Sequence, residues 1–303
     1  MHDLAKPRLL TLVVNPRSGG GRAGRMLPKV VRRLHETLPT TEVTVVQSTS
    51  WEDARASIQT AAAAARPEDT VAVMGGDGMA HLGLNGCAHT DATLAVLPAG
   101  TGNDFARALG IRDVGTALDS IAHERRRVID LTRVDNETLG ERRVGAVVSS
   151  GYDARVNRAT NDTRLRFGAL SYGYIALREL ANFEPLTYRL VLDGEPRQLR
   201  AMLVAVCNTG IFGGGMRIGP DADPADGLLD LTIVHPVSRG LLLRMLPSMY
   251  SGSFVSHPAV ERVQARRVEL DGEGLFLMGD GEELGAVPAA LECEPGALRV
   301  FVG

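Results

Sequence analysis

The sequence predicts two domains: an α/β domain built on a parallel sheet, and after it a mostly antiparallel, β-rich domain. Two observations support this. Up to about residue 122, short apolar strand-like runs alternate with helix-like runs, as in a parallel sheet with right-handed crossovers. From residue 128 onward strand-like runs dominate and turn residues separate them. We place the domains at 1–126 and 127–296, and expect a final strand near 297–303 to pack back on the first domain.

The composition and charge of the chain argue against several classes of function. With 303 residues the chain is long enough for two domains, and its net charge of −3 argues against a nucleic-acid-binding face, so we expect no nucleic-acid partner. The three cysteines are far apart and show no CxxC spacing, which favours a reducing compartment over a disulfide framework or zinc site. The N-terminus is polar and no apolar run is long enough to cross a bilayer. We therefore expect a cytoplasmic protein.

The central stretch is a buried strand at 71–74 that runs into Gly75, Gly76, Asp77 and Gly78. Glycine tolerates positive φ and lets a ligand approach the backbone, so the N–H groups there suit an anion. The Asp77 side chain suits a phosphate-bound metal ion or a ribose hydroxyl. A tight strand-to-helix turn with nothing bound is the alternative, because glycine turns are common.

The elements before this stretch repeat the same arrangement. A strand at 9–14 ends in a glycine-rich loop at 15–22, and a helix at about 25–38 follows. The loop lacks the spacing of a P-loop or a dinucleotide fingerprint, and a flexible loop without a ligand is the alternative. A strand at 42–46 and a helix at 51–65 come next, with Thr49 or Ser50 as the helix cap.

The elements after it continue the alternation. A short helix at 79–86 and a strand at 93–97 lead to a third glycine-rich loop, where Thr101 and Asn103 could face the same ligand as Asp77. We expect Asp104 to cap a helix at 105–109. Because parallel strands end at one edge of a sheet, the three glycine loops should gather there. The pattern predicts a nucleotide phosphate site.

The second domain is predicted from a series of strand-like runs. Arginines 125–127 are interpreted as a solvated helix end or linker, with a membrane-facing patch as the alternative. Predicted strands lie at 128–134, 144–149, 188–192, 201–207, 228–234 and 268–270. Helical segments are expected at 165–180 and 241–249. The first either packs on the sheet or forms a wall of an apolar lipid cleft.

Six motifs in order resemble the diacylglycerol kinase catalytic family, which includes sphingosine kinases and bacterial lipid kinases. They are NPRSGGG at 15–21, GGDG at 75–78, PAGTGNDFAR at 98–107, GYDA at 151–154, the FGGG-to-DGLLD region at 212–230, and DGE at 280–282. The resemblance spans nearly the whole chain. It implies an ATP-binding α/β domain, a β-sandwich-like domain and an active site in the cleft between them. It also implies transfer of the ATP γ-phosphate to a lipid hydroxyl.

The resemblance also implies the site residues. Asp226, with main-chain oxygens of Asp223 and Leu228, would hold Mg²⁺ outside the reaction centre, and Asp77 would help arrange the catalytic Mg²⁺. Either Asp280 or Glu282 would take the proton from the substrate hydroxyl. The residues expected to hold ATP are Asn15, Pro16, Arg17, Ser18, Gly19, Thr49, Gly75, Gly76, Asp77, Gly78, Met79, Ala80, His81, Thr101 and Asn103.

The chain has two DGE tripeptides, and we choose the one at 280–282 because it leads to a proline and a final PGALRV strand, as in the family. The tripeptide at 271–273 is interpreted as a hairpin turn. Where the family usually has Thr, Asn and Glu after GGDG, this chain has Met79, His81 and Leu82. Met79 can neither cap a helix nor donate to a phosphate, which bears on nucleotide affinity and on the phosphate donor.

Three functions compete at this point. The leading one is an ATP- and Mg²⁺-dependent lipid kinase whose partner is a lipid substrate at the membrane surface, with peripheral membrane association. An NAD kinase or phosphofructokinase-like enzyme also uses GGDG. A catalytically inactive lipid- or nucleotide-binding module is suggested by Met79. Neither the lipid nor the oligomeric state is fixed by the sequence, and a homodimer is compatible with it.

Overall fold

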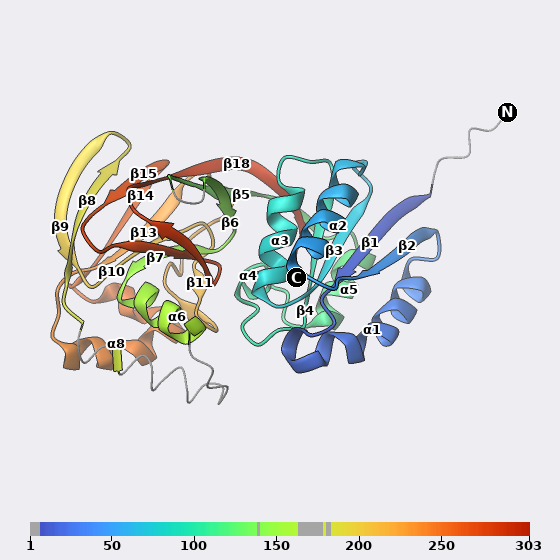
Figure 1. Cartoon of the computed structure of the whole chain (residues 1–303), viewed down its shortest axis with the longest axis horizontal. Coiled ribbons are helices and arrows are strands. Elements are labelled where there is room, and N and C mark those ends of the chain that lie inside the picture. The colour runs from blue at the N-terminus through green and yellow to red at the C-terminus, as the bar shows by residue number, and fades with distance from the viewer. Residues whose placement is uncertain (1–6, 138–139, 163–177, 180–182) are drawn as a thin grey trace. The chain divides into compact units, whose positions relative to one another are not determined.

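The computed structural model describes residues 7–137, 140–162, 178–179 and 183–303. The chain divides into two compact units (Figure 1). The first consists of Met1–Ile129 together with Gly296–Gly303, and the second is Asp130–Pro295. The chain therefore passes from the first unit to the second and returns to the first at its C-terminus.

The first unit is built on a parallel sheet, as predicted. Its strands lie in the order β2-β1-β3-β4, and each neighbouring pair is parallel. The C-terminal part of β18 adds to β4, with Arg299 opposite Thr93. The strands are β1 (Arg8–Val14), β2 (Thr41–Gln47), β3 (Thr70–Gly75), β4 (Thr93–Pro98) and β18 (Ala289–Phe301).

Helices follow these strands and cover the sheet. Every residue of β3 and β4 is buried, which explains why both read as unbroken apolar runs. Helix α2 packs beside α3, α1 contacts α5, and all four contact the sheet. The helices are α1 (Ser18–Thr37), α2 (Trp51–Ala63), α3 (Asp77–Cys87), α4 (Asp104–Ala108) and α5 (Val114–Ala122).

The second unit contains two antiparallel sheets, which confirms the predicted fold class. In one, β15 lies between β18 and β8, β9 pairs with β8, and β5 pairs with β18 and β6. In the other the order is β14-β13-β10-β7-β16-β17. Apolar side chains from both sheets, such as Leu231, Val268 and Leu277, form one buried core.

The elements of the second unit have these bounds. The strands of the first sheet, besides β18, are β5 (Arg126–Asn136), β6 (Gly140–Val144), β8 (Leu186–Leu192), β9 (Glu195–Ala201) and β15 (Arg267–Asp271). Those of the second are β7 (Val147–Gly151), β10 (Leu203–Cys207), β13 (Leu229–Val234), β14 (Val260–Ala265), β16 (Phe276–Gly279) and β17 (Glu282–Ala286). A small hairpin joins β11 (Ile211–Phe212) and β12 (Met216–Arg217), and the helices are α6 (Tyr152–Asp162), α8 (Arg239–Ser251) and a 3₁₀ turn (Ser253–Ser256).

Several predicted elements of this unit need correction. The strand expected at 144–149 is two strands, because the chain leaves β6 at Val144 and enters β7, in the other sheet, at Val147. The strand predicted at 201–207 is β10 apart from its start, because Ala201 is the last residue of β9 and β10 begins at Leu203. Arg126 and Arg127 begin β5 and are not a helix end or linker. Helix α6 was not predicted, and the helix expected at 165–180 lies outside the described residues apart from 178–179.

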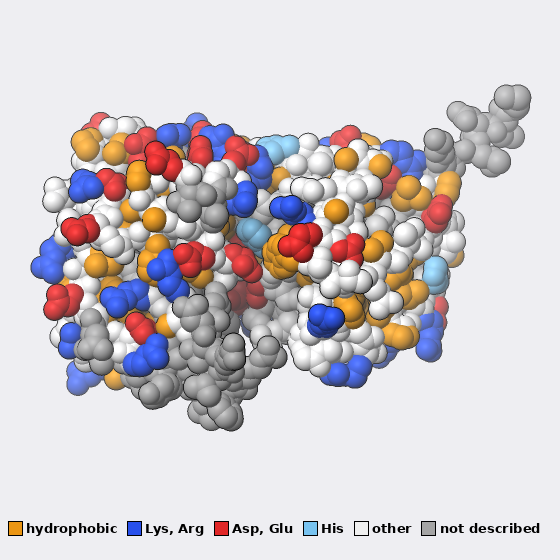
Figure 2. Space-filling model, viewed as in Figure 1, with side chains coloured by type: hydrophobic (Ala, Val, Ile, Leu, Met, Phe, Trp, Pro, Cys, Tyr) orange, Lys and Arg blue, Asp and Glu red, His pale blue; other side chains and the backbone are white. Residues whose placement is uncertain are grey.

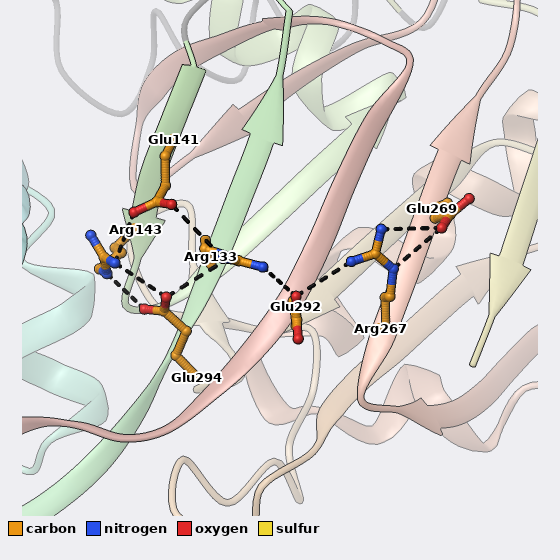
Figure 3. Close-up of polar contacts among 7 residues, drawn as sticks. All are labelled: Arg133, Glu141, Arg143, Arg267, Glu269, Glu292 and Glu294. Atoms are coloured by element: carbon orange, nitrogen blue, oxygen red, sulfur yellow. Dashed lines mark hydrogen bonds and ion pairs between the residues drawn. The ribbon is translucent and has the colours of Figure 1, made fainter. Parts of the chain in front are cut away.

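Charged side chains tie four neighbouring strands of the second unit together (Figure 3). Arg133 on β5 pairs with Glu292 on β18, and Glu292 also meets Arg267 of β15 at 3.4 Å. Arg143 on β6 meets Glu294 at 2.6 Å. The face shown in Figure 2 likewise mixes Lys and Arg with Asp and Glu over both units. Such cross-strand pairs help to set the register of the sheet.

Candidate active site

The three predicted glycine loops of the first unit lie against one another. They follow β1, β3 and β4, whose C-terminal ends share one edge of the parallel sheet. The carbonyl of Gly75 accepts hydrogen bonds from the N–H groups of Ala99 and Gly100, at 2.7 and 3.1 Å. The N–H of Asn15 donates to the carbonyl of Met74 at 3.1 Å. The sequence prediction that these loops gather is confirmed.

Glycine is required where the loops touch. A Cβ on Gly100 would lie 2.4 Å from the Cα of Gly76, and one on Gly19 would lie 2.2 Å from the carbonyl oxygen of Ala99. Both distances are shorter than side-chain carbons can approach other atoms. The loops therefore meet backbone to backbone, which leaves main-chain N–H groups, and few side chains, at this edge of the sheet.

The first loop has an unusual backbone. Helix α1 begins with a left-handed segment: Gly19, Gly20 and Gly21 have φ values of 59°, 65° and 81°, and the regular helix starts only after them. Side chains are disfavoured at such angles. A Cβ on Gly20 would meet nothing within 4 Å, so conformation, and not space, requires glycine there. The Asn15 side chain turns the chain into this loop by accepting the N–H of Arg17 at 3.0 Å.

Asp77 joins the second loop to the third. Its two carboxylate oxygens accept the N–H groups of Asn103 and Asp104, each at 2.7 Å. Helix α4 begins at Asp104, and its N-cap residue is Asn103 with φ of 57°. The expectation that Asp104 would cap this helix is therefore wrong, because Asp77 from the GGDG loop satisfies those N–H groups instead.

The polar residues near these loops differ in their exposure and in their hydrogen bonds. The Asn103 amide bridges the N–H and carbonyl of Gly100, each at 3.0 Å, so it stabilises its own loop. Thr101 is exposed between these residues. Thr49 is exposed after β2, where its N–H and hydroxyl donate to Asp53 at 2.8 and 3.0 Å. Ser50 is the cap of α2, accepting the Asp53 N–H at 3.1 Å, which completes a reciprocal capping arrangement.

Met79, Ala80 and His81 lie on the first turns of α3 with their side chains buried. Met79 packs under Gly75, where an added Cβ would come within 2.4 Å of the Met79 Cγ. His81 is buried, and its Nε2 lies 3.4 Å from the Asn85 amide nitrogen. What these positions offer a ligand is the helix N-terminus itself, through the backbone of Gly76, Asp77 and Gly78.

The terminal DGE motif of the second unit is the turn of a hairpin. Gly279 of β16 lies opposite Glu282 of β17, and Asp280 and Gly281 between them have φ of 49° and 86°. Two positive φ values in a two-residue loop are typical of a type I′ turn. The DGE tripeptide at 271–273 was expected to be a hairpin turn, and this expectation is wrong. The tripeptide connects β15 to β16, which belong to different sheets.

Asp280 and Glu282 have different surroundings. The Asp280 carboxylate accepts the N–H groups of Gly145 and Ala146, both at 2.9 Å, and so anchors the hairpin to the β6–β7 connection. Glu282 is exposed, and among the described residues no hydrogen bond or ion pair holds its carboxylate. Of these two residues, Glu282 is therefore the one whose carboxylate oxygens are both available to a substrate.

The acidic loop before β13 is held from β5. Asp223 and Asp226 are exposed, and Asp226 accepts the Leu228 N–H at 2.9 Å. The buried Asp130 carboxylate accepts the Gly227 N–H at 2.8 Å. The sequence analysis did not single out Asp130. An aspartate inside an apolar strand is nevertheless a usable signal, because a buried charge usually has a function or a partner.

A second buried polar residue links this loop to the hairpin. The Asn208 amide donates to the carbonyls of Asp130 and Gly145, at 2.8 and 3.0 Å. Gly145 in turn donates its N–H to Asp280. The second unit thus holds the acidic loop and the DGE turn in one hydrogen-bonded set.

The oxygen atoms of the acidic loop suit Mg²⁺ by type, since Mg²⁺ takes carboxylate and main-chain oxygens. Across the described ranges, no group of three or more His, Cys, Asp or Glu side chains is placed to hold a metal ion. The set of Asp223, Asp226 and Leu228 as metal ligands stays a prediction.

Comparisons with known proteins identify both parts of the chain. Residues 9–134 match the model of the diacylglycerol kinase catalytic domain. Residues 146–302 match the model of the YegS C-terminal NAD kinase beta sandwich-like domain. The chain is also 35% identical to a diacylglycerol kinase of Mycobacterium tuberculosis, over 99% of this chain and 96% of the relative. This chain belongs to the diacylglycerol kinase family.

Other members of the diacylglycerol kinase family show the same correspondence. A diacylglycerol kinase of Bacillus subtilis is 28% identical over 91% of this chain and 90% of its own. A Stenotrophomonas maltophilia protein named "Probable lipid kinase YegS-like" is 30% identical, with 84% and 85% covered. A solved structure of a Bacillus anthracis diacylglycerol kinase shares the fold, with a TM-score of 0.74, 21% identity and 98% of each chain covered.

The family resemblance inferred from the motifs is therefore confirmed, and the relatives are named as diacylglycerol or lipid kinases. None of the helices that the structure describes is both long enough and apolar enough to cross a membrane. The assignments of individual site residues stay predictions.

Proposed function

We propose that this protein is an ATP- and Mg²⁺-dependent kinase that transfers the γ-phosphate to the hydroxyl of diacylglycerol or a similar long-chain lipid. The observation that carries the proposal is the junction of the three glycine loops on the first unit, with Asp77 at its centre. Phosphoryl transfer mainly requires positioning and electrostatic stabilisation, and preorganised N–H groups supply both. The names of the relatives indicate the lipid acceptor.

Each loop has a separate task in this proposal. The backbone of Gly19, of Gly76 to Gly78 and of the third loop holds the phosphates, with Ser18 and Thr101 as exposed or half-exposed hydroxyl donors. Asp77 keeps the second and third loops in register by accepting two N–H groups. In this proposal the loops after β1, β3 and β4 bind the phosphates. Any contact with the nucleotide base would therefore come from the loop after β2, which contains Thr49.

At the acceptor, we assign proton removal to Glu282 and positioning to Asp280. The exposed Glu282 carboxylate can accept a hydroxyl proton, whereas both Asp280 oxygens already accept backbone N–H groups. A general base typically contributes about 10²–10⁴-fold to the rate.

Asp226, with main-chain oxygens of Asp223 and Leu228, would hold Mg²⁺ near the hairpin, and Asp77 would arrange the Mg²⁺ that travels with ATP. When bound, Mg²⁺ neutralises charge on the phosphate oxygens. Asp130 and Asn208 keep the acidic loop in place through Gly227 and Gly145. We further propose a cytoplasmic protein that meets its lipid by peripheral association with the membrane.

A panel of lipids in mixed micelles, with ATP and Mg²⁺ and mass-spectrometric detection, tests the proposal. We expect phosphorylated diacylglycerol or a related long-chain alcohol, and no product when ATP is omitted. The panel must include NAD, because the description of the C-terminal domain model names NAD kinase. NADP as the only product would support that second candidate. Nucleotide or lipid binding without any product would support an inactive binding module.

A further inference from the structure

Helix α8 of the second unit presents apolar side chains to solvent. Leu243 is 43% exposed and Tyr250 is 53% exposed, and they are two of only five large apolar side chains that are exposed in the described part of the chain. The Leu242, Met245 and Met249 side chains anchor the opposite face in the unit. The helix is therefore firmly packed on one face and apolar on its outer face as well.

The exposed apolar residues form one stripe. At 100° per residue, Tyr250 falls within about 20° of Leu243 around the helix, and exposed Pro247 lies about 40° to the other side. The buried Leu242, Met249 and Met245 lie about 100°, 120° and 160° from Leu243 around the helix. An ordinary surface helix places charged or polar residues at this outermost position.

The charges on this helix have one sign. Arg239 and Arg244 are exposed and flank the stripe, and α8 contains no acidic residue. Arg217 of β12, also exposed, lies next to Gly252 at the end of the helix. Asp221, which follows Pro220 beside Gly252, is paired with Arg262 at 2.6 Å. The outer face of α8 is thus apolar with a positive rim.

We propose that α8 docks on an anionic membrane surface, with Leu243, Pro247 and Tyr250 entering the interface and Arg239 and Arg244 meeting lipid phosphates. Charge complementarity favours this occupant, because an apolar stripe bordered by arginines is typical of helices that lie in the plane of a bilayer interface. Thirteen residues are too few to cross a bilayer. The inference rests on the proposed lipid kinase function in placing the protein at a membrane.

Sedimentation of the full chain with vesicles tests the docking. We expect binding to mixed phosphatidylcholine–phosphatidylglycerol vesicles and weaker binding to pure phosphatidylcholine. Leu243→Glu with Tyr250→Glu should weaken binding at least about tenfold. Arg239→Gln with Arg244→Gln should weaken it by about fivefold per arginine, and only on anionic vesicles.

Leu9→Glu is the matched control. Leu9 is 40% exposed, much like Leu243, but lies on β1 of the first unit. Since all these side chains are exposed, the unfolding temperatures should stay close to that of the parent protein. Equal vesicle binding by parent and Leu243→Glu/Tyr250→Glu would overturn the proposal. So would a dimer that this double variant dissociates while vesicle binding is unchanged, because α8 would then be a contact between copies.

A gain-of-signal variant gives an independent readout. Trp51 is the only tryptophan of the chain, so Leu243→Trp in a Trp51→Phe background reports on α8 alone. We expect its emission to shift to the blue on anionic vesicles and to be quenched by brominated lipids. Co-sedimentation without either change would place the membrane contact elsewhere and contradict the proposal.

Activity separates this inference from the function on which it rests. The Leu243→Glu/Tyr250→Glu variant should phosphorylate a short-chain, water-soluble diacylglycerol at the parent rate but lose activity on long-chain diacylglycerol in vesicles. If the parent phosphorylates neither while its vesicle binding still depends on α8, the proposed function fails and the docking surface stands. If turnover in vesicles is unaffected, the docking surface fails and the function stands.

Discussion

Glu282 and Asp280 are two residues apart on one hairpin, but the fold places their carboxylates in different surroundings. The two N–H groups of Gly145 and Ala146 occupy the Asp280 carboxylate, while the Glu282 carboxylate on β17 is exposed. The sequence could propose both residues and could not choose between them. The choice depends on a contact 135 residues away in the chain, which no local pattern reveals.

Glu282→Gln removes the proposed base and keeps its size. We expect kcat to fall about 10²–10⁴-fold, with little change in the KM for ATP and in the unfolding temperature. Glu273→Gln in the other DGE tripeptide is the matched control, since Glu273 is also exposed, and it should keep full activity. Steady-state kinetics in mixed micelles measure both. Full activity of Glu282→Gln would refute the assignment.

Asp280→Asn tests the positioning role. Asparagine tolerates the left-handed backbone at this position, but its amide keeps one acceptor for two N–H donors. One buried N–H should lose its partner, at a cost of about 1–3 kcal/mol in the free energy of unfolding. Chemical denaturation measures this loss. An unchanged unfolding free energy would show that Asp280 does not hold the β6–β7 connection.

At the scale of elements, the loops after β1, β3 and β4 work as one unit. The strand–loop–helix pattern and the glycine clusters are visible in the sequence, and their placement at one sheet edge follows from parallel pairing. The cap of α4 was not predictable, because its acceptor, Asp77, comes from another loop. Helix α6 was missed as well, since its 11 residues include few apolar ones at helical spacing.

Gly100→Ala tests the contact between the second and third loops. The new Cβ would lie 2.4 Å from the Gly76 Cα, so the two loops must separate. We expect a loss of about 1–3 kcal/mol in stability and weaker ATP binding, measured by denaturation and calorimetry. In Gly240→Ala, a Cβ on α8 would meet nothing within 4 Å, so this control should be neutral or slightly stabilising. Wild-type ATP affinity in Gly100→Ala would contradict the interlocking of the loops.

Asp69 joins the starts of β1 and β3 and predicts an acid-sensitive step. Burial raises its pKa, but hydrogen bonds from the Arg66 side chain and from the N–H groups of Arg66 and Leu9 outweigh this and lower the pKa to about 2, from 3.8. A lowered pKa means that the stabilisation is complete above about pH 4 and is lost as the pH falls toward 2.

The expected contribution is about 2 kcal/mol. Asp69→Asn should remove it, so that the unfolding free energy of the variant depends less on pH between about 4 and 2 than that of the parent. Denaturation series over this pH range measure the difference. Parallel pH curves for the two proteins would show that Asp69 is not responsible.

At the scale of the whole molecule, the family is indicated by six motifs in a fixed order along the chain, because no single tripeptide carries that information. The parallel and antiparallel sheets follow from periodicity and turn residues. The division of the apolar run at 144–149 does not follow, because Val144 and Val147 are both apolar and only the tertiary fold places them in strands of different sheets. The lipid acceptor also lies beyond what strand patterns can specify.

The most direct test of the account is a lipid kinase assay with ATP labelled by ¹⁸O at the γ-phosphate. The account predicts a lipid phosphate that carries the label, formed by the parent protein with Mg²⁺ and strongly reduced in Glu282→Gln. A label found only in NADP or in inorganic phosphate, with every long-chain alcohol left unmodified, would contradict the proposal that this protein phosphorylates lipids.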